Sequence, residues 1–256
     1  MSAVAVRTGD AFGELLRAAL AEATGSGVRP TIAGRDAAPV IELVEREDGF
    51  LSAFPAARYV ASPTDWPEFD RRALALARGR VLDVGVGGGR AALALQDQGY
   101  AVTGLDVSAG AVAVSRARGV RDVVHASVVD HTGSYDTFLL LGNNLGLLGS
   151  RAAAPAFLGA LSALAAPAAR VVAQGTDPYA TVDEAHRRYH EQNRERGRLP
   201  GQLTLRVRYR DLATDWFDYL LCSPAELETL VAGTGWRVES IDDADAPRYL
   251  AVLARG

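Results

Sequence analysis

The sequence predicts an α/β fold built on a mostly parallel β-sheet. From Arg80 onward, short apolar segments alternate with helical ones, and parallel strands joined through helices produce this alternation. The expected strands are 81–85, 101–106, 122–126, 136–141, 170–174, 236–241 and 248–253. The expected helices are 90–98, 109–118, 152–165 and 224–232, and the last of these begins with the capping sequence SPAE.

Two segments lie outside this alternation. Residues 1–75 are expected to form a helical N-terminal extension or lid, with helices over 12–20, over 39–47 and after residue 65, and loops at 25–35 and 54–67. Residues 76–256 then form the main domain. Within it, the insertion 176–222 holds a polar helix (182–194) and two alternating segments, 203–209 and 215–221, which predict an antiparallel hairpin.

Composition excludes several function classes. The net charge is −4, and all 27 basic residues are arginine, so no lysine is present to form a Schiff base or a Walker phosphate site. The single cysteine, Cys222, excludes an internal disulfide and a cysteine metal cage. We expect a cytoplasmic protein with no membrane partner and no nucleic-acid partner, although five arginines cluster within 187–198.

A glycine-rich turn follows the first expected strand. The segment VLDVGVGGGR, residues 81–90, enters the turn as an apolar strand and leaves it as a helix. Glycines let a ligand approach the backbone closely, and a helix N-terminus offers free N–H groups. The turn therefore predicts a nucleotide-like cofactor.

Two carboxylates narrow the choice of cofactor. A dinucleotide would bring its pyrophosphate close to Asp83, which would repel it, whereas S-adenosylmethionine (SAM) would bring a cationic ammonium. A nicotinamide-dependent oxidoreductase is therefore disfavoured. Asp106 ends the next strand and suits the two ribose hydroxyls of either cofactor, while capping of the following helix is its structural alternative.

These segments resemble motifs I and II of the class I SAM-dependent methyltransferases. The resemblance is carried by LDVGVGGG at 82–89 and LDVS at 105–108, and it extends to the order of elements from 80 to 256. It implies a Rossmann-like seven-stranded sheet whose antiparallel last strand inserts between the fifth and the sixth, and it implies SAM as the cofactor. The cofactor contacts implied by the resemblance are Asp83, Gly85, Gly87, Gly89, Asp106, Val107, Ser127, Val128, Gly142, Asn143 and Tyr59.

The resemblance also implies roles for several of these residues. The three glycines should surround the methionine part, Asp83 its ammonium and Asp106 the ribose, while Val107 should cover adenine. Ser127 stands where the family often has an acidic residue. The turn LGNNLG, residues 141–146, differs from the Asn-Pro-Pro-Tyr signature of methyltransferases that act on amide or amine nitrogens, and its asparagines could equally serve the turn itself.

Candidate catalytic side chains lie outside these motifs. Methyl transfer depends mainly on positioning, and a general base helps only when the nucleophile arrives protonated. His186, Tyr189 and His190 share a helix face, and His131 follows the third strand; a solvated helix face is the alternative for the first three. The pair His186 and His190 lacks the glutamate of a zinc-protease helix, so no metal is expected. Trp216, Phe217 and Tyr219 could pack the core or wall an apolar pocket.

The expected function is methyl transfer from SAM to an oxygen, nitrogen or carbon of a small molecule. A methyltransferase acting on protein or RNA remains an alternative, which a basic groove along 187–198 would favour. A protein that binds SAM without methylating is a second alternative.

Overall fold

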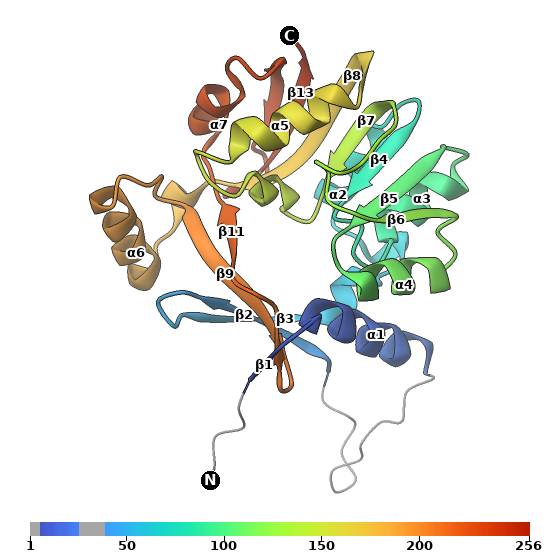
Figure 1. The fold of residues 1–256 in the computed structure, drawn as a ribbon, viewed down its shortest axis with the longest axis horizontal. Coiled ribbons are helices and arrows are strands. Elements are labelled where there is room, and N and C mark those ends of the chain that lie inside the picture. Colours follow the sequence, from blue (N-terminus) through green and yellow to red (C-terminus); the bar gives the residue numbers. More distant parts are fainter. Residues whose placement is uncertain (1–5, 26–38) are drawn as a thin grey trace, which may run out of the picture.

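The computed structural model describes residues 6–25 and 39–256, which contain two β-sheets (Figure 1). The main sheet has seven strands in the order β12-β13-β8-β7-β4-β5-β6. Its strands are β4 (Val81–Val84), β5 (Val102–Asp106), β6 (Asp122–His125), β7 (Tyr135–Leu140), β8 (Ala165–Thr176), β12 (Trp236–Asp242) and β13 (Arg248–Arg255). β13 runs antiparallel between β8 and β12, so the predicted insertion of the last strand is confirmed.

Helices cover both faces of the main sheet. The helices of the described residues are α1 (Ala11–Thr24), α2 (Glu68–Ala75), α3 (Arg90–Asp97), α4 (Ala109–Ala117), α5 (Ala154–Ala163), α6 (Glu184–Glu195) and α7 (Pro224–Val231). Helices α2, α3 and α4 cover one face, and α5 and α7 cover the other, whereas α1 packs on α4 and α6 lies away from the main sheet. Successive residues of β7 point to opposite faces: Phe138 packs in the layer of α5 and α7, and Leu139 packs in the layer of α2 and α3. Burial on both faces explains why these strands are continuously apolar. No helix of the described residues is long and apolar enough to cross a membrane.

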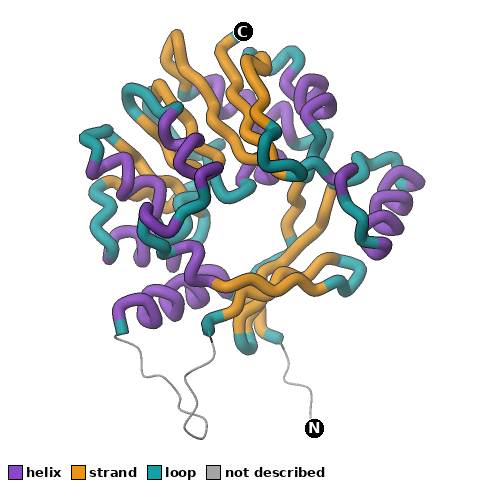
Figure 2. Tube along the Cα trace, turned by 180° about the vertical axis from the view of Figure 1, so that it is seen from behind, coloured by secondary structure: helices purple, strands orange, loops and turns teal. Residues whose placement is uncertain are grey.

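The second sheet, here called the lid sheet, combines strands from distant parts of the chain. It contains β1 (Arg7–Thr8), β2 (Ile41–Arg46), β3 (Leu51–Pro55), β9 (Gln202–Tyr209), β10 (Leu212–Ala213) and β11 (Phe217–Leu220). The antiparallel pairing of β9 with β11 confirms the predicted hairpin of the insertion. Figure 2 shows the long strands of the insertion rising from the lid sheet toward the main sheet.

The N-terminal extension is only partly helical, which corrects one expectation. The helix predicted over 39–47 is wrong, because this segment forms β2, which pairs with β3 on one side and β9 on the other. Val40, Leu43 and Val44 match a helical spacing, but in so short a run this spacing also fits a strand. The tertiary pairing with β9 decides between them. The segment 54–67 holds the end of β3 and two 3₁₀ turns, η1 (Ala56–Tyr59) and η2 (Pro63–Asp65), and the loop predicted at 25–35 lies outside the described residues from 26 on.

Asp10 joins the extension to the main domain. Its carboxylate accepts hydrogen bonds from the Gly13 N–H at the start of α1 (2.9 Å) and from the Gly110 N–H at the start of α4 (2.8 Å). The Ser108 hydroxyl donates to the same carboxylate (2.8 Å). One side chain therefore satisfies the N-termini of two helices from different parts of the chain.

Removal of this carboxylate should destabilise the protein. Burial alone would raise the pKa of Asp10, but the hydrogen bonds from Ser108, Gly13 and Gly110 hold the pKa below its ordinary value. Asp10→Ala is expected to lower the free energy of unfolding by about 1–4 kcal/mol at neutral pH, since two caps are lost. The stabilisation is present above the unfolded-state pKa of about 4 and is lost as the pH falls through the lower folded-state value. Urea unfolding of the wild type and the variant, at neutral pH and in acid below the folded-state pKa, measures the difference in unfolding free energy.

Asp97→Ala, on the exposed end of α3, is the control and should change stability by less than about 0.5 kcal/mol. An Asp10→Ala penalty that is equally large in acid would contradict the capping role.

Candidate functional site

The glycine turn between β4 and α3 forms the centre of the candidate site. Gly85, Gly87 and Gly89 have positive φ angles of 76°, 54° and 76°, which residues with a Cβ rarely adopt. A Cβ at Gly88 would overlap the carbonyl oxygen of Tyr59. The sequence therefore needs glycine here both for backbone conformation and for close approach of η1.

Side chains from three elements hold the backbone of this turn. Asp106, at the end of β5, accepts the Gly87 N–H (2.9 Å). The Ser115 hydroxyl of α4 donates to the Gly87 carbonyl (2.8 Å). The Asn144 amide donates to the carbonyl oxygens of Val84 (3.1 Å) and Gly85 (3.2 Å). The sequence left two roles open for Asn144, one within its own turn at 141–146 and one at the site. In the structure its side chain supports the neighbouring glycine turn.

Asp83 is a buried carboxylate at the carboxyl end of β4. It is 4% exposed, and burial, with a further contribution from Asp106, raises its pKa to about 7. The positive charge of Arg90 and the Ala92 N–H act in the opposite direction. A buried carboxyl group whose pKa is raised toward neutral pH beside a glycine turn is typical of a functional site.

A chain of polar contacts connects Arg90 to the turn after β7. Arg90 forms an ion pair with Asp70 (2.6 Å) and lies over the Trp66 ring (4.9 Å to its centroid). The Gln174 amide donates to Asp70 (2.9 Å), and its oxygen accepts the Gly142 N–H (2.7 Å). Asp70 and Gln174 were missed from the sequence because they lie 104 residues apart and meet only in the fold.

The predicted cofactor residues beyond the glycine turn also follow the carboxyl ends of the strands. Val107 is 71% exposed, as expected for a residue that could cover a ligand. The Ser127 hydroxyl donates to Asp130 (2.6 Å), so an acidic side chain stands beside the position where Ser127 replaces one. Val128 is buried in the core between the sheet and α5, and Asn143 takes a left-handed conformation (φ 74°).

Tyr59 lies beside the glycine turn. Its ring meets Phe12 edge to face, with 5.2 Å between centroids. A Cβ placed on Gly87 would lie 3.9 Å from both rings. The Arg118 guanidinium donates to the carbonyl oxygens of Gly88 and Val60, which ties η1 to the turn.

His131 is not near the site, which corrects that prediction. The loop after β6 returns to the amino ends of the strands before β7 begins, and His131 follows it there. Its Nε2 lies 2.8 Å from the hydroxyl of Tyr135, the first residue of β7. Burial lowers the pKa of His131, and Asp122 and Arg80, which influence it, stand at or beside the starts of β6 and β4.

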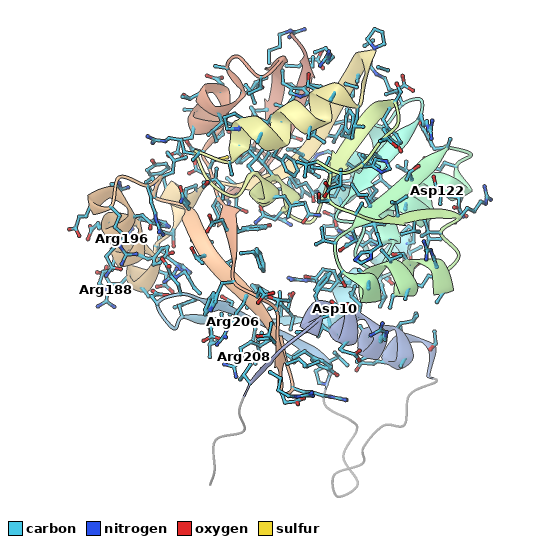
Figure 3. All side chains as sticks on the ribbon, in the orientation of Figure 1. Asp10, Asp122, Arg188, Arg196, Arg206 and Arg208 are labelled. Atoms are coloured by element: carbon cyan, nitrogen blue, oxygen red, sulfur yellow. The ribbon has the colours of Figure 1, made fainter. Side chains whose placement is uncertain are left out.

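Two of the three candidates on α6, His186 and Tyr189, hold this helix against the β2–β3 hairpin. His186 Nδ1 lies 2.9 Å from Arg46 Nη1, and the hydroxyl of Tyr189, a residue that is 1% exposed, donates to Glu47 (3.0 Å). Burial and nearby positive groups lower the pKa of His190 to about 4, and this side chain lines a cavity of about 210 Å³ beside Tyr179. In Figure 3, Arg188 and Arg196 mark α6 at the outer end of the lid sheet, far from Asp10. The structure therefore separates these residues from the glycine turn.

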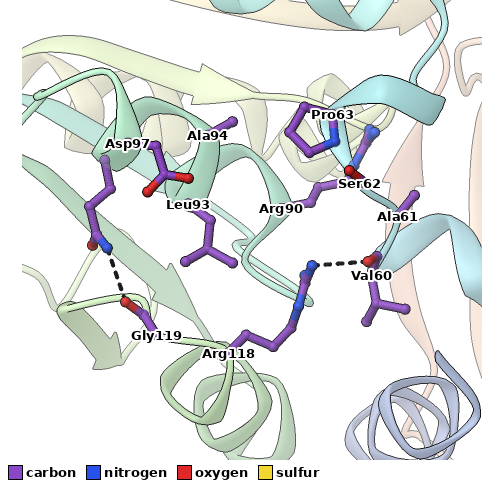
Figure 4. Close-up of a pocket in the computed structure, with 11 residues that line it drawn as sticks. Val60, Ala61, Ser62, Pro63, Arg90, Leu93, Ala94, Asp97, Arg118 and Gly119 are labelled. Atoms are coloured by element: carbon purple, nitrogen blue, oxygen red, sulfur yellow. Dashed lines mark hydrogen bonds between the residues drawn. The ribbon is translucent and has the colours of Figure 1, made fainter. Parts of the chain in front are cut away.

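A larger open cavity, of about 460 Å³, lies on the outer side of α3 (Figure 4). Arg118, Leu93 and Val60 line it, and none of the predicted cofactor residues does. Arg118 also donates to the Gly88 carbonyl, so this cavity adjoins the glycine turn without including the predicted cofactor residues.

Comparison with known proteins agrees with this geometry. A family model described as a methyltransferase domain matches residues 81–175, which span β4 to β8. A SAM-dependent methyltransferase from Bacteroides fragilis, solved with S-adenosylhomocysteine, is similar over 98% of both chains with 25% identity and a TM-score of 0.78. Residues 81–175 therefore form a methyltransferase domain, and the chain as a whole has the fold of a SAM-dependent methyltransferase. No protein in the comparison with curated proteins matches it.

Two further methyltransferase structures share the fold. CcbJ from Streptomyces caelestis has 18% identity and a TM-score of 0.55, covering 75% of this chain and 94% of its own. CalS10 from Micromonospora echinaspora, an amino pentose methyltransferase, has 19% identity and a TM-score of 0.54, covering 78% and 95%. The predicted Rossmann-like sheet is thereby confirmed.

A Cβ at Gly88 should push η1 away from the glycine turn of this methyltransferase. Gly88→Ala would place a methyl group on the Tyr59 carbonyl, and overpacking of this kind costs about 1–3 kcal/mol. Thermal unfolding measures the loss. Gly159→Ala is the matched control, because a Cβ there meets nothing within 4 Å in α5 and should stabilise by about 0.5–1 kcal/mol. Equal melting temperatures for Gly88→Ala and the parent protein would contradict the close approach.

Proposed function

We propose that this protein transfers a methyl group from SAM to an oxygen, nitrogen or carbon atom of a small-molecule acceptor in the cytoplasm. The observation that carries the proposal is the pair of buried carboxylates at the glycine turn, Asp83 and Asp106. Asp83 would meet the cationic amino-acid group of SAM, and Asp106 would meet its ribose.

The residues present fit SAM as the cofactor. The turn has three glycines with positive φ. A Cβ at Gly142 would meet nothing within 4 Å, so the backbone at Gly142 is open to a ligand. The Bacteroides fragilis relative was solved with S-adenosylhomocysteine, which supports the same choice. The residues proposed to contact SAM are Asp83, Gly85, Gly87, Gly89, Asp106, Val107, Ser127, Val128, Gly142, Asn143 and Tyr59.

The chain's own contribution to the chemistry is positioning. SAM, when bound, supplies a methyl group on a positively charged sulfur, which is ready for in-line displacement. Asp83 and Asp106 would orient the two ends of the cofactor, and the lid sheet would exclude water from the acceptor. The contacts of His186 and Tyr189 with the β2–β3 hairpin favour a role in holding the lid rather than in proton transfer.

Contacts of the arginine cluster favour a small acceptor over a protein or RNA. Arg196 and Arg198 both pair with Glu47 (3.3 Å each). Arg187 donates to the Thr181 carbonyl (3.2 Å). Since nucleic-acid binding depends on arginines that are free to meet phosphates, the intramolecular contacts of these three arginines reduce what the cluster offers to RNA.

Calorimetry with SAM, S-adenosylhomocysteine and NAD tests the proposed cofactor. We expect the first two to bind and NAD not to bind. Mass analysis of candidate acceptors incubated with protein and SAM should then show the gain of one methyl group. Binding of NAD without SAM would overturn the proposal, and SAM binding without any methylated product would favour a non-methylating role.

Neutralisation of Asp83 should weaken SAM binding in a pH-dependent manner. Asp83→Asn is expected to reduce affinity by about one to two orders of magnitude, because hydrogen bonds to charged groups contribute ~1.5–3 kcal/mol. The pKa of Asp83 in the free protein is raised to about 7. Below that pH the carboxyl is protonated and the ammonium has no charged partner, so wild-type affinity should rise from about pH 5.5 to 7.

Calorimetry across this pH range measures the effect, and Asp83→Asn should remove the pH dependence. Asp122→Asn, at the amino end of β6, is the control and should keep the wild-type profile. A variant at position 83 that retains full affinity at every pH would refute the role of the carboxylate.

A further inference from the structure

Glu42 is a buried carboxylate on β2 that the proposed cofactor site does not use. It is 2% exposed. The Tyr59 hydroxyl donates to it, at 3.0 Å from Oε1 and 3.1 Å from Oε2. Arg58 forms an ion pair with the same carboxylate and also donates to the Tyr59 hydroxyl (2.9 Å). The three side chains thus form a closed hydrogen-bonded cluster.

This cluster lies on the face of the lid sheet that meets the main domain. Strand register puts Glu42 and Val44 of β2 on the same face as Val207 of β9 and Tyr219 of β11. The Tyr219 ring packs against Gly146, and its hydroxyl donates to the Asn143 carbonyl (2.5 Å). This face therefore contacts the turn that follows β7.

The neighbouring glutamate on the other face has different partners. Glu45 pairs with Arg206 (2.7 Å) and Arg208 (3.3 Å), which lie across the strand from it on β9. Glu45 resembles Glu42 in residue type, strand and arginine pairing, but it has no contact with Tyr59. It provides a matched control within the same strand.

Tyr59 is the residue through which Glu42 reaches the glycine turn. The Tyr59 backbone is packed against Gly88, and its ring stands beside Gly87 and against Phe12. The side chain is therefore fixed at two ends, by the turn at its backbone and by Glu42 at its hydroxyl. Without the second anchor, the ring would be free to rotate away from Gly87.

We propose that Glu42 is a positioning residue that holds the Tyr59 ring against the glycine turn and so couples the lid sheet to cofactor binding. The inference rests on the proposed function, because it places Tyr59 at the cofactor. Arg58 completes the arrangement by neutralising the buried carboxylate while donating to the tyrosine hydroxyl. The lid sheet then acts on the cofactor through one side chain as well as by covering the acceptor.

The test uses Glu42→Gln, Tyr59→Phe, Tyr59→Ala, the double variant Glu42→Gln/Tyr59→Ala, and the control Glu45→Gln. Calorimetry with S-adenosylhomocysteine measures affinity, and thermal unfolding reports the stability of each variant. Glu42→Gln and Tyr59→Phe should each weaken affinity by about tenfold, since each removes a hydrogen bond to a charged group. Glu45→Gln should change affinity by less than about twofold.

The double variant separates positioning from a general structural role. If Glu42 acts through Tyr59, Glu42→Gln should cause no further loss of affinity in the Tyr59→Ala protein. Additive losses, or wild-type affinity in Glu42→Gln, would show that the carboxylate only stabilises the lid and would overturn the inference. Should Glu42→Gln fail to fold, Tyr59→Phe decides alone, because it deletes only the donating hydroxyl, and wild-type affinity in it overturns the inference.

Failure of the proposed function gives a different result. If the proposed cofactor is wrong, the unmodified protein would bind neither SAM nor S-adenosylhomocysteine, and the inference would fall with it. Binding by the unmodified protein together with unaffected variants would reject the role of Glu42 alone.

Discussion

The backbone of the glycine turn between β4 and α3 is the constraint on which the rest of the structure depends. Asp106, Ser115 and Asn144 hold it from three different elements, and Gly88 admits the backbone of η1. The turn has positive φ angles that only glycine adopts readily. These hydrogen bonds hold its backbone in that conformation. Strand β5, helix α4, the turn after β7 and the N-terminal extension all contact this one segment.

Burial gives the acidic groups near the turn their chemical character. Burial removes Asp83 from solvent and Asp106 adds a nearby negative charge, so the pKa of Asp83 is raised to about 7. Arg90 moderates this effect while it is itself paired with Asp70. The polar contacts from Arg90 through Asp70 and Gln174 to Gly142 connect the glycine turn after β4 with the turn after β7. A cationic ligand group beside Asp83 would favour its ionised form and would oppose the effect of burial on its pKa.

The lid sheet contacts both turns of the candidate site, and its strands come from segments before and after the main sheet's first five strands. β2 and β3 precede the main domain in sequence, whereas β9 and β11 follow β8. Their shared inner face carries Glu42 next to Tyr59 and Tyr219 next to Asn143. Movement of this sheet would therefore displace side chains at both the glycine turn and the turn after β7.

The sequence by itself determined the main sheet and the residues of the glycine turn, and its family resemblance implied the antiparallel last strand. Alternating apolar segments and glycine spacing are local properties, and they indicate buried parallel strands and a turn without knowledge of distant partners. Only the tertiary structure decided that 41–46 is a strand, since its pairing with β9 overrides an ambiguous period. It likewise brought Glu42 to Tyr59 and Asp70 to Gln174 and took His131 to the opposite edge of the sheet. These outcomes depend on contacts between residues far apart in the chain, which no local pattern records.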